Sequence, residues 1–143
     1  MKNTRAVIVD SGALYALFDR HDDHHKASLA WITASKQRTL LTNVCVLTEV
    51  TYLLHRRGLG EAVDPFLEWT SNSLMVDRDT VDDLLRIRAI MAQYADLPAD
   101  FTDASLVALA ERVSCFTVAS VDRDFTIYRG ACRRSFTNLI KRT

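Results

Sequence analysis

Acidic side chains at the ends of apolar segments are the residues of this sequence best able to do chemistry. Asp10 directly follows the β-branched run 6–9, and Asp122 lies two residues beyond the apolar run 116–120. Runs without alternation are typical of strands buried on both faces of a parallel sheet, whose carboxyl ends share one ligand-binding edge. Each aspartate alone also fits the N-terminus of a helix, where the macrodipole favours an acid. Position therefore leaves both roles open.

Glu49 stands in the segment 44–57, whose helical periodicity makes its surroundings almost entirely apolar. Its nearest neighbours on a helical wheel are Cys45, Val46, Tyr52 and Leu53. A buried carboxylate in such surroundings is costly unless it is protonated, paired with a base or bound to a cation. Arg56 or Arg57 on the next turn is the candidate structural partner, and a metal ion is the alternative.

Asp103 opens the apolar helix 104–110, whose body must pack on the sheet, so we expect its carboxylate over the same edge. Asp100 shares that place, and helix capping is the structural alternative for both. Four acids at one edge, with no Lys or His beside them, repel one another unless divalent cations lie between them. Oxygen ligands favour Mg²⁺ or Mn²⁺, which activate water and neutralise a phosphodiester. The residues therefore indicate a phosphodiesterase.

The elements that would hold these acids alternate between strands and helices. The pattern predicts strands at 6–9, 39–42, 74–77 and 116–120. It predicts helices at 13–18, 22–36, 44–57, 65–71, 80–94 and 102–113, with Asn43 as an N-cap. Because helices supply the crossovers that parallel strands need, we expect an α/β fold of three layers, a central parallel sheet of four or five strands with helices on both faces. Residues 1–143 show no linker or repeat and are predicted to form a single domain.

Charge is balanced over the whole chain but not along it. Eighteen basic and eighteen acidic side chains give a net charge of zero, so nothing global indicates a nucleic-acid or membrane partner. Residues 123–143, in contrast, hold six basic side chains and one acid. An acidic metal site needs nearby cations to let a polyanion approach, so this basic tail is the predicted polyanion-binding surface. Its candidate residues are Arg123, Arg129, Arg133 and Arg134.

The three cysteines, Cys45, Cys115 and Cys132, are odd in number and lie far apart among apolar residues. This usage predicts reduced thiols rather than disulfides or zinc ligands, and with them a cytoplasmic location. The first apolar run stops at Asp10, too early for a signal peptide, and no run approaches the roughly 18 residues of a membrane span. We therefore expect a protein that is neither exported nor anchored in a membrane.

Four motifs, in order along the whole chain, resemble those of PIN domains. They are Val7-Ile8-Val9-Asp10-Ser11-Gly12-Ala13-Leu14, Leu47-Thr48-Glu49-Val50, Phe101-Thr102-Asp103-Ala104-Ser105 and Ala119-Ser120-Val121-Asp122-Arg123-Asp124-Phe125. The chain is most similar to the stand-alone VapC-type toxins of bacteria and archaea. That likeness extends to the stretch Asp23-His24-His25-Lys26-Ala27.

The resemblance implies a metal-dependent endoribonuclease, the toxin of a toxin–antitoxin pair, with a small antitoxin as its inhibitor. It carries the family's acidic positions, which would bind Mg²⁺ or Mn²⁺, onto Asp10, Glu49, Asp103 and Asp122, with Ser11 and Ser120 as supporting hydroxyls. Asp124 is a second candidate for the fourth ligand, and Asp100 is a further acid nearby. Toxins of this resemblance often pair, so we also expect a homodimer.

Other functions fit the residues less well. A phosphatase of the haloacid dehalogenase type would use Asp10 but needs a second acid where Gly12 stands. A phosphorylated receiver-like module needs an acidic pair before its first helix and a late buried lysine, which the sequence does not offer. Zinc binding is disfavoured because His24 and His25 are adjacent in a polar segment. A catalytically silent PIN-like scaffold that binds RNA or protein is the alternative that the sequence leaves open.

Overall fold

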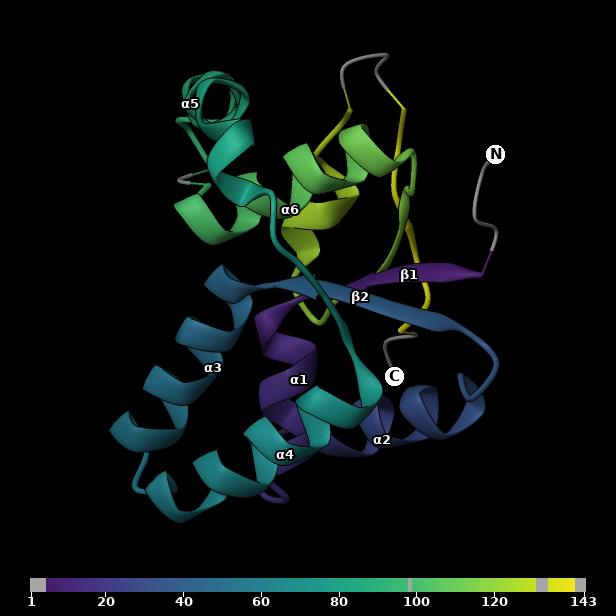
Figure 1. Cartoon of the computed structure of the whole chain (residues 1–143), viewed down its shortest axis with the longest axis vertical. Coiled ribbons are helices and arrows are strands. Elements are labelled where there is room, and N and C mark those ends of the chain that lie inside the picture. Colours follow the sequence, from purple (N-terminus) through teal and green to yellow (C-terminus); the bar gives the residue numbers. More distant parts are fainter. Residues whose placement is uncertain (1–4, 98, 131–133, 141–143) are drawn as a thin grey trace.

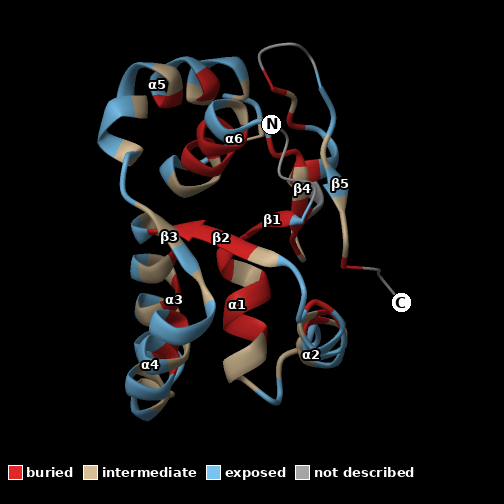
Figure 2. Ribbon diagram, turned by 45° about the vertical axis from the view of Figure 1, so that its right-hand side comes forward, coloured by how far each residue is buried: buried red, intermediate tan, exposed pale blue. Residues whose placement is uncertain are grey.

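β1 (Ala6–Val9) is the central strand of a parallel sheet in the computed structural model, which describes residues 5–97, 99–130 and 134–140, without the side chain of Arg123. The other strands among these residues are β2 (Thr39–Asn43), β3 (Met75–Asp77), β4 (Thr117–Ala119) and β5 (Thr137–Asn138). The order across the sheet is β3-β2-β1-β4-β5, and every pairing is parallel. All of β1 is buried, as Figure 2 shows, because both of its faces are covered.

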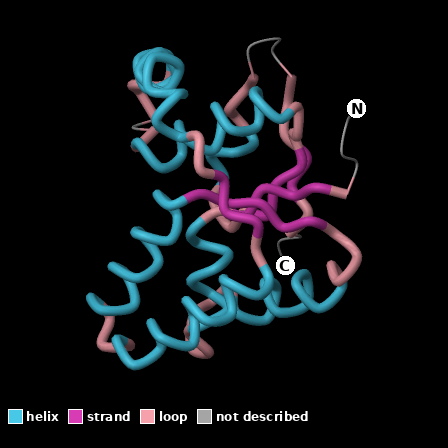
Figure 3. The backbone as a smooth tube through the Cα atoms, viewed as in Figure 1, coloured by secondary structure: helices cyan, strands magenta, loops and turns pink. Residues whose placement is uncertain are grey.

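Helices cover the two faces of this sheet. Those below it in Figure 1 are α1 (Ser11–Phe18), α2 (His25–Ala34), α3 (Val44–Arg56) and α4 (Val63–Ser73). Those above it are α5 (Leu84–Gln93) and α6 (Phe101–Val113). Figure 3 shows the strands as a layer between the two groups of helices. The predicted three-layer α/β fold is thus confirmed, and the parallel sheet has five strands in the described part of the chain.

Polar side chains begin three of these helices. Asp10 accepts a hydrogen bond from the backbone N–H of Ala13 at 2.9 Å and so caps α1. Asn43, predicted as a cap, accepts from the N–H of Val46 at 3.2 Å at the start of α3. Asp100 caps α6 by accepting from the N–H of Asp103 at 2.8 Å. Asp10 directly follows β1 and Asn43 is the last residue of β2, so the same residues fix the helix starts and the polar edge of the sheet.

Arg112, near the end of α6, forms ion pairs that connect α6 to α5 and to β3 of the sheet. Its guanidinium donates to Asp77 at the end of β3 and to Asp83 before α5, with shortest distances of 2.7 and 3.0 Å. Both carboxylates are largely buried, and they raise the pKa of Arg112 well above its usual value. This ion-pair network holds α5, α6 and β3 together.

Three segments differ from the sequence-based expectation. The helix predicted at 80–94 is a 3-10 turn, Thr80–Asp83, followed by α5. The helix predicted at 22–36 starts only at His25, because Asp22 forms a turn with Asp19 and accepts from the N–H of His24. β5 falls in the segment predicted only as a basic tail, and it pairs with β4.

No helix within the described residues is both long enough and apolar enough to span a bilayer. Cys115 is buried and donates through Sγ to the carbonyl oxygen of Ala6, and Cys45 is partly exposed. Both are free thiols, as the sequence predicts. Cys132 lies outside the described residues.

Candidate metal centre

A polar pocket lies at the carboxyl edge of the sheet, where β1 and β4 end. Its volume is about 550 Å³, and its walls come from the starts of α1 and α6, from one turn of α3 and from the loop after β4. The lining residues are Asp10, Ser11, Gly12, Glu49, Leu53, Asp100, Asp103, Val121 and Asp122. The four acids that the sequence analysis selected, together with Asp100 and Ser11, therefore lie around one cavity.

Asp10 is the most deeply buried of these acids, with 5% of its surface exposed. One carboxylate oxygen accepts from the N–H of Ala13, and the other accepts from the hydroxyl of Ser120. Burial raises the pKa of Asp10 to about 6, although both hydrogen bonds favour the charged form. The negative charges of Asp122 and Glu49 raise this pKa further. Ionising the carboxyl group of Asp10 without a bound cation therefore lowers the stability of the folded protein.

Asp103 lies in the first turn of α6, where its carboxylate accepts from the hydroxyl of Tyr128 at 3.0 Å. Its pKa is raised to about 8, first by burial and next by the charge of Asp100. Asp122 and Asp10 add smaller repulsive contributions, and the hydrogen bond from Tyr128 opposes the rise. Asp103 is thus a protonated acid at neutral pH unless a cation is present to stabilise its ionised form.

Asp122 and Asp124 complete the cluster from the loop after β4. Asp122 begins the 3-10 turn Arg123–Thr126 and accepts from the N–H of Asp124 at 2.9 Å. Carboxylate oxygens of Asp103, Asp122 and Asp124 lie within 4.8 Å of one another. Burial, and then the charge of Asp122, raise the pKa of Asp124. Asp122 therefore faces both the pocket and Asp124, so both candidates for the fourth ligand belong to one group of acids.

Glu49 reaches the pocket, but the reason given for its importance from sequence is wrong. It is only half-buried, because α3 buries a single stripe of Val46, Val50 and Leu54 against the core. Val44 and Tyr52, which make the helical wheel look apolar all round, are 59% and 56% exposed. The proposed structural partners contact other groups instead. Arg56 donates to the hydroxyl of Tyr52, and Arg57 lies near Asp22 and over the ring of Tyr15.

Two serines and a glycine shape the pocket. Ser120 is buried, and its hydroxyl donates to Asp10 and accepts from the N–H of Asp122 at 2.9 Å. Ser11, predicted as a second supporting hydroxyl, lines the same cavity. A Cβ atom at Gly12 would lie 2.6 Å from Cγ2 of Val121, so only glycine lets α1 approach the loop after β4 this closely. The same contact leaves no room for the acid that a phosphatase of the haloacid dehalogenase type would need there.

Tyr128 and Asn138 are site residues that the sequence analysis missed. Tyr128 is fully buried and bonds to Asp103, while Asn138 bonds through its side chain to the backbone of Ser120. Both come from the segment that was interpreted as a basic tail. The apolar residues of that segment, such as Phe136 and Ile140, are the signal that it packs against the domain.

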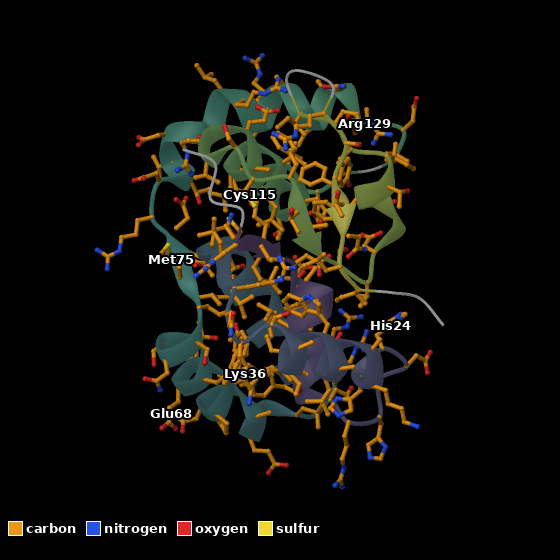
Figure 4. The ribbon with its side chains drawn as sticks, turned by 90° about the vertical axis from the view of Figure 1, so that its right-hand side faces the viewer. His24, Lys36, Glu68, Met75, Cys115 and Arg129 are labelled. Carbon is orange, nitrogen blue, oxygen red and sulfur yellow. The ribbon has the colours of Figure 1, made fainter. Side chains whose placement is uncertain are left out.

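One described basic residue of this tail, Arg134, lies toward the opposite end of β4 from the acids. The guanidinium carbon of Arg134 lies 4.9 Å from the ring centroid of Phe116, the residue that precedes β4. Asp122 lies beyond the opposite end of this strand. Phe116 and Ser120 are four residue steps apart along this strand, about 13 Å at about 3.3 Å per residue. Arg129 donates to the carbonyl oxygens of two neighbouring residues, and Figure 4 shows it on the α5–α6 side. The remaining candidates, Arg133 and the side chain of Arg123, lie outside the described residues.

The donor chemistry of the pocket fits a divalent cation. Among its described lining residues there are five carboxylates and no Lys, Arg or His. Burial and mutual repulsion raise the pKa of two of these acids, Asp10 and Asp103, and a cation between them would relieve both effects. Carboxylate and hydroxyl oxygens suit hard ions such as Mg²⁺ and Mn²⁺, whereas zinc sites in proteins are built from Cys and His.

Comparisons with known proteins agree with this architecture. The model of the PIN domain family matches residues 7–130, the range that contains every acid of the pocket. Among solved structures, the fold is similar to the crystal structure of VapC20 from Mycobacterium tuberculosis, a sarcin-ricin loop cleaving toxin. The TM-score is 0.77 at 23% identity, over 85% of this chain and 93% of that one. The sequence matches no curated protein. Because the family model spans most of its length, the chain belongs to the PIN domain family.

Proposed function

We propose that this protein is an endoribonuclease that depends on Mg²⁺ or Mn²⁺ and acts as the toxin of a toxin–antitoxin pair. The observation that carries the proposal is a group of five carboxylates around one pocket, with no basic side chain among its described lining residues and with the pKa values of Asp10 and Asp103 raised. Acids removed from water are normally paired with a basic side chain, whereas the hydrogen-bond partners of Asp10 and Asp103 in the described part of the chain are a backbone N–H and two hydroxyls. Membership of the PIN domain family and the likeness to a toxin that cleaves the sarcin-ricin loop support the same activity.

The residues we propose as ligands are Asp10, Glu49, Asp103 and Asp122, with Asp124 beside Asp122 as the second candidate for the fourth ligand. A bound Mg²⁺ or Mn²⁺ supplies a water of lowered pKa and offsets the charge of the phosphodiester. The protein holds the acids in place beforehand. The hydroxyl of Ser120 donates to one carboxylate oxygen of Asp10, and the backbone N–H of Ala13 in the first turn of α1 donates to the other. Together these two hydrogen bonds fix the orientation of the carboxylate.

Tyr128 has the corresponding role at Asp103. Its hydroxyl donates to one carboxylate oxygen, and its ring is fixed by edge contacts with Tyr94 and Phe125. A neutral donor such as this phenol orients the carboxylate and leaves its negative charge available to a cation. A lysine in the same place would neutralise that charge. Burial, and next the charge of Asp103, raise the pKa of Tyr128 above its usual range. The phenol therefore keeps its proton and remains a hydrogen-bond donor at neutral pH.

Partners follow from the same proposal. RNA is the substrate, a small antitoxin is the inhibitor, and a second copy of the chain forms a homodimer. Exposed apolar side chains on α3 and at the start of α6, namely Val44, Tyr52 and Phe101, offer surface for protein contacts beside the pocket. A cytoplasmic location and a single domain over residues 1–143 belong to the proposal as well.

Arg129 and Arg134, with Arg123 and Arg133, remain our candidates for contacts with RNA phosphates. Because Arg134 lies near the amino end of β4, an RNA strand that touches it and the acids must run along this strand for about 13 Å. That span corresponds to a few nucleotides on one side of the cleaved bond. The proposal therefore requires a single-stranded or looped substrate that extends beyond the pocket.

The test is cleavage of a fluorescent RNA by purified protein, with Mn²⁺ or with a chelator, for the wild type, Asp103→Asn and Asp64→Asn. Asp64 is an exposed acid on α4 and serves as the matched control. We expect cleavage by the wild type and the control only, and only with metal. RNA binding without cleavage by a wild type that binds Mn²⁺ would instead favour the catalytically silent scaffold.

A further inference from the structure

Asn138 occupies an unusual place beyond the end of the PIN domain match, which stops at residue 130. It is the second residue of β5, and its side-chain amide contacts both backbone groups of Ser120. Its Oδ1 accepts from the N–H of Ser120 at 3.1 Å, and its Nδ2 donates to the carbonyl oxygen of Ser120 at 2.8 Å. The same Oδ1 accepts from the N–H of Ile140 at 3.1 Å. The amide of Asn138 thus holds both the N–H and the carbonyl group of Ser120.

These contacts continue the sheet where its ladder ends. The N–H groups of Thr137 and Leu139 bond to the carbonyl oxygens of Phe116 and Val118 at 2.8 Å, as in an ordinary parallel pair. The next backbone groups after the end of β4 belong to Ser120, which is 1% exposed and therefore needs protein partners. The amide of Asn138 supplies a donor and an acceptor in the place of another strand residue.

Ser120 in turn holds two of the pocket acids. Its hydroxyl donates to Oδ2 of Asp10 and accepts from the backbone N–H of Asp122 at 2.9 Å. The hydroxyl can make both contacts only while the backbone of Ser120 keeps its position relative to β1 and to the loop after β4. A continuous chain of hydrogen bonds therefore runs from Asn138 through Ser120 to Asp10 and Asp122.

We propose that Asn138 is a positioning residue of the metal centre, so that β5, outside the family match, sets the affinity of the pocket for a divalent cation. The inference rests on the proposed function, because it assumes that Asp10 and Asp122 bind the ion. Asn138 acts through Ser120, since each of its hydrogen bonds at this site ends on the backbone of that residue.

The chemistry of the amide makes the inference specific. Aspartate has nearly the same shape as asparagine, but it places a second acceptor against the carbonyl oxygen of Ser120 and adds a charge near Asp10. Alanine removes both contacts and leaves buried backbone groups without partners. Neither change touches a proposed ligand. Thr137, the exposed neighbour of Asn138 in β5, offers a matched control, because Thr137→Ala perturbs the same strand without altering the contacts to Ser120.

The experiment measures Mn²⁺ affinity by calorimetry, well below each unfolding midpoint, for the wild type, Asn138→Asp, Asn138→Ala, Ser120→Ala, Thr137→Ala and the double variant Asn138→Ala/Ser120→Ala. We expect Mn²⁺ to bind about 10- to 100-fold more weakly in the Asn138 and Ser120 variants, with Thr137→Ala at the wild-type value. Because both residues act on Asp10 through one path, the double variant should bind no more weakly than Ser120→Ala alone.

Three results would overturn the inference while leaving the proposed function intact. The first is wild-type Mn²⁺ affinity in folded Asn138→Ala. The second is wild-type affinity in Ser120→Ala, which decides the matter even if the Asn138 variants do not fold, and the third concerns the control variant Thr137→Ala. A wild-type protein that binds no Mn²⁺ at all would overturn the proposed function and this inference together. Equal weakening by Thr137→Ala would also overturn it, because it would assign the effect to loss of β5 pairing in general.

Discussion

Asp10→Asn should stabilise the metal-free protein, although it removes a proposed ligand. Burial raises the pKa of Asp10 to about 6 in the folded protein, against an ordinary value of 3.8 for a solvated aspartate. Folding at neutral pH therefore requires an ionised carboxylate in a place that favours the neutral acid. Asparagine is about as good an N-cap as aspartate, and its amide oxygen can still accept from Ala13 or Ser120. The substitution thus removes the charge and keeps the local structure.

The size of this effect depends on pH in a defined way. Below pH 3.8 the carboxyl is protonated in both the folded and the unfolded state, so ionisation contributes no difference. Between pH 3.8 and 6 the unfolded chain ionises first, and stability is lost as the pH rises. Above pH 6 the whole penalty is present, and a rise of roughly two pKa units corresponds to about 3 kcal/mol. Asp10→Asn should therefore stabilise by up to about 3 kcal/mol at pH 7.5 and by little at pH 3.5.

Urea unfolding followed by circular dichroism, in chelator at several pH values, measures this difference directly. Asp64→Asn, at an exposed acid on α4, is the control that should stay near the wild type throughout. Saturating Mn²⁺ should reverse the order, because only the wild type retains the full set of ligands. If Asp10→Asn is destabilised at pH 7.5 in chelator, or if its effect is the same at all pH values, the reasoning about this pocket is wrong.

Further outcomes test other parts of the account. Mn²⁺ affinity should rise about tenfold per pH unit from pH 6 to pH 8, because the proton of Asp103, whose pKa is about 8, must leave; calorimetry showing no pH dependence would contradict this. Arg112→Ala should lower the free energy of unfolding by about 3 kcal/mol in denaturant titrations, because it leaves the largely buried carboxylates of Asp77 and Asp83 unpaired. A loss below about 1 kcal/mol would show that this ion-pair network contributes little to stability. Replacing Arg133 and Arg134 by Ala should weaken RNA binding in Ca²⁺ about equally for all sequences and reduce the salt slope by about 1.4, whereas an unchanged slope would assign them to protein contacts. Light scattering should give twice the chain mass of 16.2 kDa at micromolar concentration, and 16.2 kDa would refute the homodimer.

The order of strands and helices could be predicted because both signals are local. β1 and β4 are apolar runs followed at once by acids, and Asn43 caps the helix that its position indicates. Since parallel strands end at one edge, the positions of Asp10 and Asp122 after two such strands are enough to predict that both line a common pocket.

The supporting contacts could not be predicted in the same way, because they join distant segments. Tyr128 meets Asp103 across 25 residues, and Asn138 meets Ser120 across 18. No periodicity of the sequence encodes such pairs. The environment of Glu49 was misjudged for a related reason: a helical wheel counts apolar residues but does not show which face finds a partner, and α3 leaves Val44 and Tyr52 exposed.

The measurement that tests the central claim most directly is Mn²⁺ binding by the purified wild-type protein and by Asp103→Asn, paired with RNA cleavage in the same samples. The account predicts that the wild type binds Mn²⁺ and cleaves RNA, and that Asp103→Asn remains folded while losing both properties. Asp103→Asn that binds Mn²⁺ and cleaves RNA as the wild type does would contradict the assignment of this pocket as a metal-dependent nuclease centre.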